Sequence, residues 1–192
     1  MSIDINYEHM FPTSVGVIDN FLTEEERIDL LEDIKHKRAI HNPAFLGNAT
    51  SSLRLENTFL NTDIQNRIQD SIDQYSKKYG CPRQKMWHYW FNIQDSNSVL
   101  TEHTHPNATL SGVLYLNVDD TCRIFFHTPN PYTCFVEKDP VDGCTEYTYE
   151  YYWMRVRNCQ LIVFPSWLKH GKNDEVNQMD NRIAISFNTH KY

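Results

Sequence analysis

The sequence predicts an α+β fold in which two helices cover one face of a β-sandwich or barrel. Two amphipathic helical patterns lie before Pro82. After Pro82 the chain consists of short aromatic and β-branched runs that are typical of strands. Helices first and strands afterwards favour separate layers over alternating βαβ units. The 192 residues, 40% of them hydrophobic, can form a substantial core. We therefore expect one domain over 1–192, with a helical part at 1–82 and a β-core at 83–192.

The first helix is predicted from its N-cap and its apolar stripe. Thr23 is a favourable N-cap residue, and Glu26 three residues later completes a capping box. Acidic residues fill the first turn, where the helix dipole favours negative charge. The stripe continues to about Lys37 and consists of Ile28, Leu30, Leu31 and Ile34.

A polar stretch separates the two helices. His41–Leu55 is rich in Asn, Ser and Thr, which predicts a loop with a short strand around Leu53–Leu55. The second helix is capped by Asn61 or Thr62 and ends at Gly80-Cys81-Pro82. Each helix has one apolar face, so each needs a sheet to cover. In the second helix this face consists of Ile64, Ile68, Ile72, Tyr75 and Tyr79.

The strands of the β-core are predicted from short apolar and aromatic runs. One long segment, Thr128–Thr145, contains three prolines and a glycine and has no strand or helix pattern. A long loop in a compact domain is commonly a lid or a binding loop, and a tolerated surface insertion is an equal alternative. The predicted strands are Met86–Ile93, Val113–Asn117, Arg123–Phe126, Tyr147–Val156, Leu161–Phe164 and Ile183–Asn188.

Two histidines stand one residue apart at the start of HTHPNATLSGVLYLN, residues 103–117. Side chains alternate along a strand, so His103 and His105 are predicted to share one face. His170 follows another apolar run and can supply a third imidazole.

Iron(II) sites that activate O2 commonly hold the metal on two His and one carboxylate. Here His105 stands in the carboxylate position, because Glu102 would point to the opposite face. Three histidines keep the facial geometry and make the centre one charge more positive. The alternative is that they are ordinary core or surface histidines.

Arg182 opens the strand RIAISFN, whose two faces differ. One face is apolar, while the other presents Arg182, Ala184, Ser186 and Asn188. A buried guanidinium is costly unless it is paired. This face suits a dicarboxylate, whose far carboxylate would take the arginine fork and the Ser186 hydroxyl. The alternative is that Arg182 pairs with an Asp or Glu of the protein.

Charge and composition limit the classes of partner and compartment. The chain has 25 acidic and 18 basic residues, a formal charge of -7, and no long basic run, which argues against nucleic acid as a partner. The sequence contains neither a signal peptide pattern nor a stretch apolar enough to span a membrane. Five widely spaced cysteines predict reduced thiols, although Cys134 and Cys144 could pair across a hairpin. We therefore expect a cytoplasmic protein.

The chain resembles the 2-oxoglutarate and Fe(II)-dependent oxygenase superfamily. The resemblance lies in the prolyl-hydroxylase-like branch, in a subgroup seen in bacteria and phages in which a His-x-His motif is usual. It covers most of the chain and rests on the order and spacing of IDNFLTEEE, HTHPNATLSGVLYLN, LIVFPSWLKH and RIAISFN. The resemblance implies a double-stranded β-helix, a jelly-roll barrel formed by 83–192, with the N-terminal helices packed on its major sheet.

The resemblance also implies the site residues. His105 stands where the wider family carries a carboxylate. The first barrel strand of the family often contributes a polar residue to the cosubstrate, for which Asn92 is the nearest match. The implied positions are His103, His105 and His170 for Fe(II), and Arg182, Ser186, Tyr115 and Asn92 for 2-oxoglutarate.

An enzyme of this kind consumes O2 and 2-oxoglutarate, releases succinate and CO2, and hydroxylates a small molecule or a peptide. Thr128–Thr145 is the candidate for covering the substrate. Several aromatic residues could wall the pocket, although most are expected in the core; these are Trp87, Tyr89, Trp90, Trp153 and Trp167.

Two other functions compete with this one. A three-histidine dioxygenase whose substrate itself chelates the iron would have no use for Arg182 as a dicarboxylate clamp. A non-catalytic jelly-roll module would bind metal, for example zinc, without consuming O2. The positions of Arg182, Ser186 and Tyr115 favour the 2-oxoglutarate enzyme over both. The sequence decides neither the substrate nor the oligomeric state.

Overall fold

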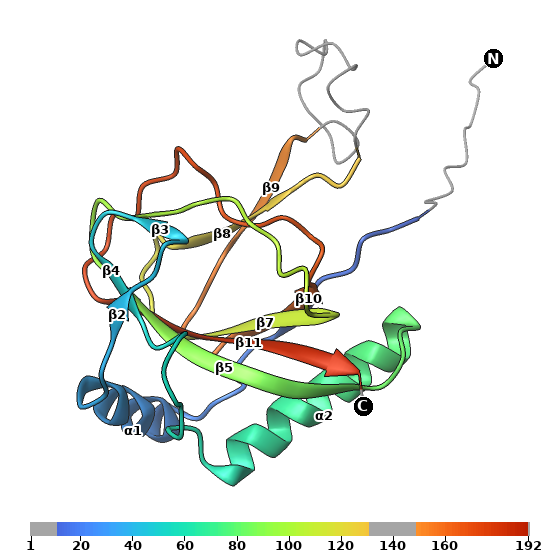
Figure 1. Ribbon diagram of the computed structural model, residues 1–192, viewed down its shortest axis with the longest axis horizontal. Coiled ribbons are helices and arrows are strands. Elements are labelled where there is room, and N and C mark those ends of the chain that lie inside the picture. Colours follow the sequence, from blue (N-terminus) through green and yellow to red (C-terminus); the bar gives the residue numbers. More distant parts are fainter. Residues whose placement is uncertain (1–10, 131–148, 192) are drawn as a thin grey trace, which may run out of the picture.

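A seven-stranded antiparallel sheet forms the larger layer of the molecule (Figure 1). The computed structural model describes residues 11–130 and 149–191. The order along the sheet is β1 (Gly16–Ile18), β10 (Leu161–Pro165), β7 (Leu110–Asn117), β11 (Arg182–Lys191), β5 (Gln84–Gln94), β4 (Ala49–Ser51) and β2 (Ile40–His41). Apart from β4 and β2, neighbouring strands of the sheet come from distant parts of the chain, as in a sandwich rather than a simple meander.

Two short ribbons form a second layer over one face of this sheet (Figure 1). One ribbon pairs β3 (Phe45–Leu46) with β6 (Val99–Leu100), and the other pairs β8 (Arg123–His127) with β9 (Tyr151–Arg155). The segment 170–172 joins the two ribbons, because His170 forms a β-bridge to Phe126 on β8 and the Lys172 N–H donates to the Leu100 carbonyl on β6. His170 also forms a β-bridge to His103. The structure thus has the two β-layers that the sequence predicts.

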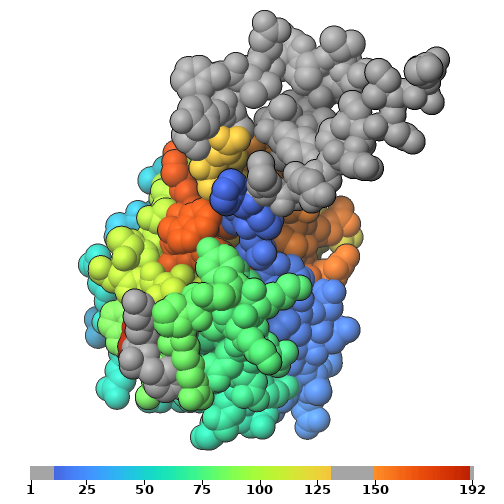
Figure 2. Space-filling view, turned by 90° about the vertical axis from the view of Figure 1, so that its right-hand side faces the viewer, coloured from blue at the N-terminus to red at the C-terminus, as the bar shows by residue number. Residues whose placement is uncertain are grey.

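The two helices cover the other face of the major sheet (Figure 1). Helix α1 (Glu24–Lys35) begins with the predicted capping box between Thr23 and Glu26. Helix α2 (Thr62–Tyr79) is capped by the Asn61 side chain, and Gly80 ends it in a left-handed conformation. Figure 2 shows α2 lying across this side of the molecule beside the segment that leads into β1. Both predicted helices are confirmed.

Two apolar clusters lie on opposite faces of the major sheet. The cluster under the helices includes Ile34, Ile68, Phe91 and Ile185, none more than 1% exposed. Burying each such side chain stabilises the fold by about 2 kcal/mol. The cluster between the layers includes Tyr115, Ile124, Phe126, Ile162 and Phe164.

The predicted division of faces on β11 is confirmed. Ile183, Ile185 and Phe187 belong to the cluster under the helices, and Ala184 packs against the cluster between the layers. Because side chains alternate, Arg182 and Ser186 face the second layer. This geometry brings polar groups of the sheet into the space between the layers.

The structure corrects the prediction for His41–Leu55. Leu53–Leu55 is a turn, and the strands of this region are β2, β3 and β4. The small strand β4 has no large apolar residue and takes its conformation from pairing with β5. Such a strand depends on its neighbour and leaves no local pattern.

The structure also shows that His103 and His105 do not lie in the regular strand that the sequence predicts. His103 forms only an isolated bridge, and a turn at Pro106-Asn107 separates the pair from β7. The remaining predicted strands are present with ends shifted by a few residues, although Tyr147 and most of Thr128–Thr145, with Cys134 and Cys144, lie outside the described residues. Within the described ranges, no helix is both long and apolar enough to cross a membrane.

Candidate functional site

Three histidine rings meet between the two layers. The ring centroids of His103 and His170 are 4.2 Å apart, and His105 lies 5.0 Å from His103 and 5.1 Å from His170. One nitrogen from each ring lies within 4.8 Å of the others. Among the described residues, this is the one group of His, Cys, Asp or Glu side chains that could hold a metal ion. The three histidines singled out in the sequence therefore converge in space.

Backbone hydrogen bonds hold the three segments together. His103 N–H donates to the His170 carbonyl and His170 N–H donates to the His103 carbonyl, both at 3.0 Å. His105 N–H donates to the Ser166 carbonyl at 2.9 Å. The rings are thus positioned by pairing with the segment after β10.

The backbone also selects the tautomer of two rings. His103 Nδ1 lies 2.8 Å from the Thr101 carbonyl, and His170 Nδ1 lies 3.1 Å from the Leu168 carbonyl. A carbonyl oxygen only accepts, so each Nδ1 carries the proton and each Nε2 keeps a free lone pair. This is the arrangement in which imidazole binds a metal ion.

Burial favours the neutral form of all three rings. Burial, together with His103, lowers the pKa of His105 to about 4. Burial and the two other rings place the pKa of His170 well below its usual range. Burial also lowers the pKa of His103, against the opposing effect of its hydrogen bond to Thr101. At neutral pH the site therefore offers uncharged ligands, which suit Fe, Zn, Ni or Cu.

Glu102 takes no part in this group, as the alternation argument predicts. Its carboxylate accepts a hydrogen bond from the Tyr151 hydroxyl and pairs with Lys169 Nζ at 3.2 Å. Burial acts to raise the pKa of Glu102, but these two partners hold it below the usual range. The carboxylate is thus ionised and engaged outside the histidine group.

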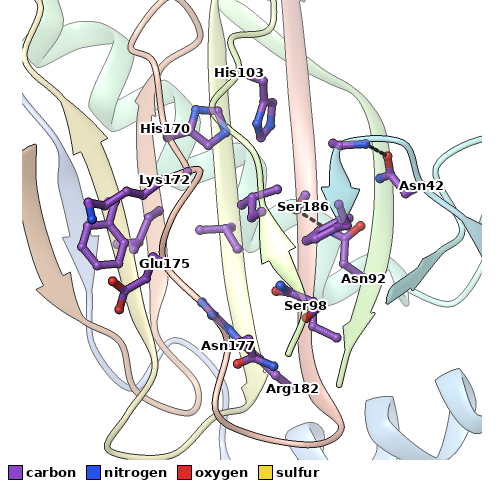
Figure 3. Close-up of a pocket in the computed structure, with 18 of the residues that line it drawn as sticks. Asn42, Asn92, Ser98, His103, His170, Lys172, Glu175, Asn177, Arg182 and Ser186 are labelled. Carbon is purple, nitrogen blue, oxygen red and sulfur yellow. Dashed lines mark hydrogen bonds between the residues drawn. The ribbon is translucent and has the colours of Figure 1, made fainter. Parts of the chain in front are cut away.

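A cavity of about 350 Å³ extends from the histidines into the space between the layers. In Figure 3, His103 and His170 lie at one end and Arg182 at the other, with Ser186 between them. Trp90 and Phe164 flank the histidine end, where their rings lie 6.1 Å from His105 and 4.9 Å from His170. The cavity can therefore hold a ligand that reaches from the histidines to the guanidinium.

Arg182 has hydrogen-bonding capacity left for a ligand. Its Nη2 donates to the Arg123 carbonyl at 2.9 Å, and its guanidinium contacts the Tyr115 hydroxyl. Its Nε is buried without a hydrogen-bond partner. Within the described residues no Asp or Glu pairs with Arg182, so the alternative of an internal ion pair finds no support there.

The other polar residues predicted for a cosubstrate gather at the same cavity. Asn92 Nδ2 donates to the Ser186 hydroxyl at 3.1 Å, and Asn92 Oδ1 is buried without a partner. Burial raises the pKa of Tyr115 to about 12, against the lowering effect of Arg182, so its hydroxyl is neutral. Unsatisfied buried polar atoms are rare in proteins. Their presence on Asn92 and Arg182 in one cavity indicates a polar ligand.

The comparison with protein families agrees with this chemistry. The family model described as "Putative 2OG-Fe(II) oxygenase" matches residues 88–188, more than half of the chain. The chain belongs to this family. It is an Fe(II)- and 2-oxoglutarate-dependent oxygenase. No curated protein matches the chain.

Solved structures show the fold of this oxygenase. A prolyl-4-hydroxylase from Pseudomonas putida is 11% identical, with a TM-score of 0.61 and coverage of 94% of both chains. HygX from Streptomyces hygroscopicus, solved with nickel, 2-oxoglutarate and hygromycin B, is 12% identical, with a TM-score of 0.59 and coverage of 93% of this chain and 82% of HygX. The viral collagen prolyl hydroxylase vCPH from Paramecium Bursaria Chlorella virus-1, solved with 2-oxoglutarate, is 12% identical, with a TM-score of 0.59 and coverage of 93% and 96%. The fold is the expected double-stranded β-helix.

Sequence reasoning missed part of the oxygenase cavity. Arg123 on β8 lines it and stacks over the Trp153 ring at 4.9 Å. Its alternation with buried Ile124 was the one available signal. Lys172 and Glu175 also line the cavity, from a loop without periodicity.

The aromatic residues divide differently from the prediction. Trp90 is buried and lines the cavity, and Tyr89 packs against the cluster under the helices. Trp87, Trp153 and Trp167 are 60%, 51% and 50% exposed, so placing most of these aromatics in the core is wrong. A local pattern cannot distinguish an aromatic face that meets another layer from one that meets water.

Proposed function

We propose that the oxygenase is a hydroxylase that holds Fe(II) on His103, His105 and His170 and binds 2-oxoglutarate toward Arg182. The observation that supports this most directly is the cavity with three neutral imidazoles at one end and an unpartnered guanidinium nitrogen at the other. When bound, Fe(II) and 2-oxoglutarate would supply the oxidation, in which O2, 2-oxoglutarate and a substrate C–H bond give succinate, CO2 and the hydroxylated substrate.

The histidines fit the metal through their protonation. Each imidazole is neutral, and the Nδ1 protons of His103 and His170 are directed to carbonyls, so the ligating nitrogens need not lose a proton. Within the part of the chain that the structure describes, neither ring nitrogen of His105 has a hydrogen bond of this kind to a backbone carbonyl. The backbone bridges hold the rings in place before any metal arrives.

The far end of the cavity fits a carboxylate. Arg182 offers its free Nε, the neutral Tyr115 hydroxyl contacts its guanidinium, and the Ser186 hydroxyl lines the same cavity as a further donor. Arginine provides the charge and the fork geometry that a carboxylate prefers. We propose that Asn92 reorients its amide to the same ligand, which would satisfy its unpartnered oxygen.

Apolar side chains exclude water from the rest of the cavity. Trp90, Val113 and Phe164 line it and are buried or half-buried. Exclusion of water strengthens the interactions of Arg182 and protects the oxidation from side reactions. The remaining volume is open to O2 and to a small-molecule or peptide substrate.

The proposal also covers the number of domains and the cellular compartment of the protein. We infer one domain for 1–192, because both helices pack on one face of the major sheet and the second layer packs on the other. We infer the cytoplasm, which is supported by the free buried thiols of Cys122 and Cys159.

A second candidate is a three-histidine dioxygenase whose substrate chelates the metal directly. The presence of His105 in the carboxylate position favours it, since neutral ligands leave the full charge of the metal for an anionic substrate. It gives no role to the free Nε of Arg182, so we rank it second.

The test is an anaerobic titration of the Fe(II)-loaded protein with 2-oxoglutarate, followed by the visible charge-transfer band of the chelate. We expect a saturable band in the wild type and in Arg38→Ala, an exposed-arginine control. In Arg182→Ala, the loss of the paired charge, worth about 2–5 kcal/mol, raises the Kd for 2-oxoglutarate roughly 30-fold or more. Iron binding without a band in the wild type would instead support the second candidate, and unchanged iron binding in His105→Ala would exclude His105 as a ligand.

A further inference from the structure

A second polar cluster lies next to the histidines but outside their group. Lys169 Nζ contacts Glu102 Oε2 at 3.2 Å, and the Tyr151 hydroxyl donates to Glu102 Oε1. The Glu102 side chain is 15% exposed and that of Lys169 is 45% exposed. Both oxygens of a largely buried carboxylate are thus occupied by residues from two other segments.

The positions of this cluster in the chain connect it to the metal ligands. Glu102 immediately precedes His103, and Lys169 immediately precedes His170. Backbone hydrogen bonds join the two segments: the β-bridge between His103 and His170, the His105 N–H to the Ser166 carbonyl, and the Lys172 N–H to the Leu100 carbonyl. These bonds position the two backbones, and the contact between Glu102 and Lys169 adds a side-chain link immediately beside the bridge between the two ligands. Asn173 Oδ1 also accepts from the Glu102 N–H at 2.9 Å.

Tyr151 extends the link to the ribbon of β8 and β9. It is the first residue of β9, and its ring lies 5.1 Å from His127 on β8 and 5.5 Å from Lys172 Nζ. The same ribbon carries Phe125, which lines the cavity. The ribbon bonds to the segment of His170 through its backbone, because the His127 N–H donates to the Lys169 carbonyl and the Gly171 N–H donates to the Phe125 carbonyl. The Tyr151 hydroxyl adds a direct link from the ribbon to Glu102, next to His103.

We propose that Glu102 is a positioning residue of the metal centre: held by Lys169 and Tyr151, its carboxylate fixes His103 relative to His170 and couples both to the β8–β9 ribbon. This inference rests on the proposed function, because it requires a metal ion on these histidines. It assigns Glu102 no contact with the metal, the cosubstrate or the substrate.

The test measures Co(II) binding to the metal-free protein, with the visible d–d bands as the report on coordination geometry and thermal unfolding of the metal-free protein as the report on the fold. Glu102→Gln removes the charge and keeps the size, and Tyr151→Phe removes only the hydroxyl. Tyr152→Phe is the matched control, because Tyr152 is the next residue of β9 and is 58% exposed. Lys169→Met removes the cation.

In Glu102→Gln we expect the Co(II) Kd to rise about ten-fold and the d–d bands to shift, since losing a group that orients metal ligands typically costs about 10–100-fold in affinity. Tyr151→Phe should give a smaller change in the same direction, and Tyr152→Phe none. In the Lys169→Met background, Glu102→Gln should have less effect than it has alone, because the two residues act as one unit.

Unchanged Kd and d–d bands in both Glu102→Gln and Tyr151→Phe, with wild-type metal binding intact, would overturn the positioning role, even if thermal stability falls. If Glu102→Gln does not fold, Tyr151→Phe and Lys169→Met decide the question by the same two readouts. Failure of the wild type to bind Co(II) in a way that depends on His105 and His170 would overturn the proposed function itself.

Discussion

As a ligand of the proposed metal site, His105 would leave the metal ion one charge more positive than a carboxylate would. Three neutral imidazoles leave a divalent ion with its full charge of two, whereas a facial site with one carboxylate leaves it with one. Burial keeps His105 neutral, and Arg182 adds a further positive charge at the other end of the cavity. In the proposed site, a doubly negative cosubstrate would therefore be attracted to both ends of the cavity.

Neutral burial of His105 makes the stability of the metal-free protein depend on pH. Its pKa is about 4 when folded and about 6.5 when unfolded, so protons bind the unfolded chain first as the pH falls. Stability is full above about pH 6.5 and declines between about pH 6.5 and 4. Urea unfolding should show a loss of about 1–2 kcal/mol from His105 alone between pH 7.5 and 5. The His105→Gln variant should lose about 1–2 kcal/mol less than the wild type over this pH range. Equal losses of unfolding free energy in the two proteins would contradict the prediction.

Gly171, next to His170, is required by its close approach to another strand. Its φ is +89°, and a Cβ would lie 2.5 Å from the Thr101 carbonyl oxygen and 2.8 Å from that of Leu100. Gly171→Ala should cost about 2–3 kcal/mol or more in urea unfolding, from backbone strain plus the clash. Gly80→Ala is the control, with φ +76° and nothing within 4 Å of the added Cβ. It should cost only about 1–2 kcal/mol, and equal losses in the two variants would show that the clash is relieved.

At the level of elements, α2 holds the sheet from outside while the site forms on its inner face. Ile64, Ile68 and Ile72 are almost completely buried against the sheet. On β5, Phe91 packs toward the helices while Trp90 and Asn92 line the cavity. Because side chains alternate along β5, the packing of Phe91 against the helices also fixes the positions of Trp90 and Asn92 in the cavity.

Ile68→Ala should test the contribution of α2 packing. Ile68 is fully buried, so the lost contacts and the remaining cavity should cost about 2–5 kcal/mol in urea unfolding. The matched control is Ile28→Ala in α1, where the side chain is 48% exposed, and should change stability by no more than about 0.5 kcal/mol. A loss in Ile68→Ala as small as that of the control would mean that α2 is not part of the cooperative unit.

At the scale of the whole molecule, the candidate site requires both layers. The segment 170–172 joins the two ribbons, since His170 bridges Phe126 on β8 and Lys172 bonds to Leu100 on β6, while Arg182 and Ser186 come from the major sheet. A metal ion on the histidines would therefore bind the folded chain and not the unfolded one. Binding of this kind stabilises the fold in proportion to the logarithm of metal concentration.

Thermal unfolding with Ni(II) should reveal this coupling. At a free concentration of about 100 times the Kd, the metal should add about 2.7 kcal/mol to the folding free energy. The midpoint should rise with concentration in the wild type and stay constant in His170→Ala. A rise of the same size in His170→Ala would place the metal elsewhere.

The amino-acid sequence by itself determined the elements whose signals are local. The capping box at Thr23 and Glu26, the isoleucine stripe of α2 and the alternation of β11 each arise from periodicity that a short segment carries alone. The spacing of the histidines and Arg182 also pointed to the family that the comparison then showed.

Only the tertiary structure decided which residues and strands contact one another. The histidine pair lies outside a regular strand, and its rings converge because backbone pairing joins His103 to His170. The small strand β4, the cavity role of Arg123 and the exposure of Trp153 likewise depend on neighbours distant in the chain. Short-range periodicity encodes which face of an element is apolar, whereas the partner of that face is set by pairing between segments far apart in the sequence.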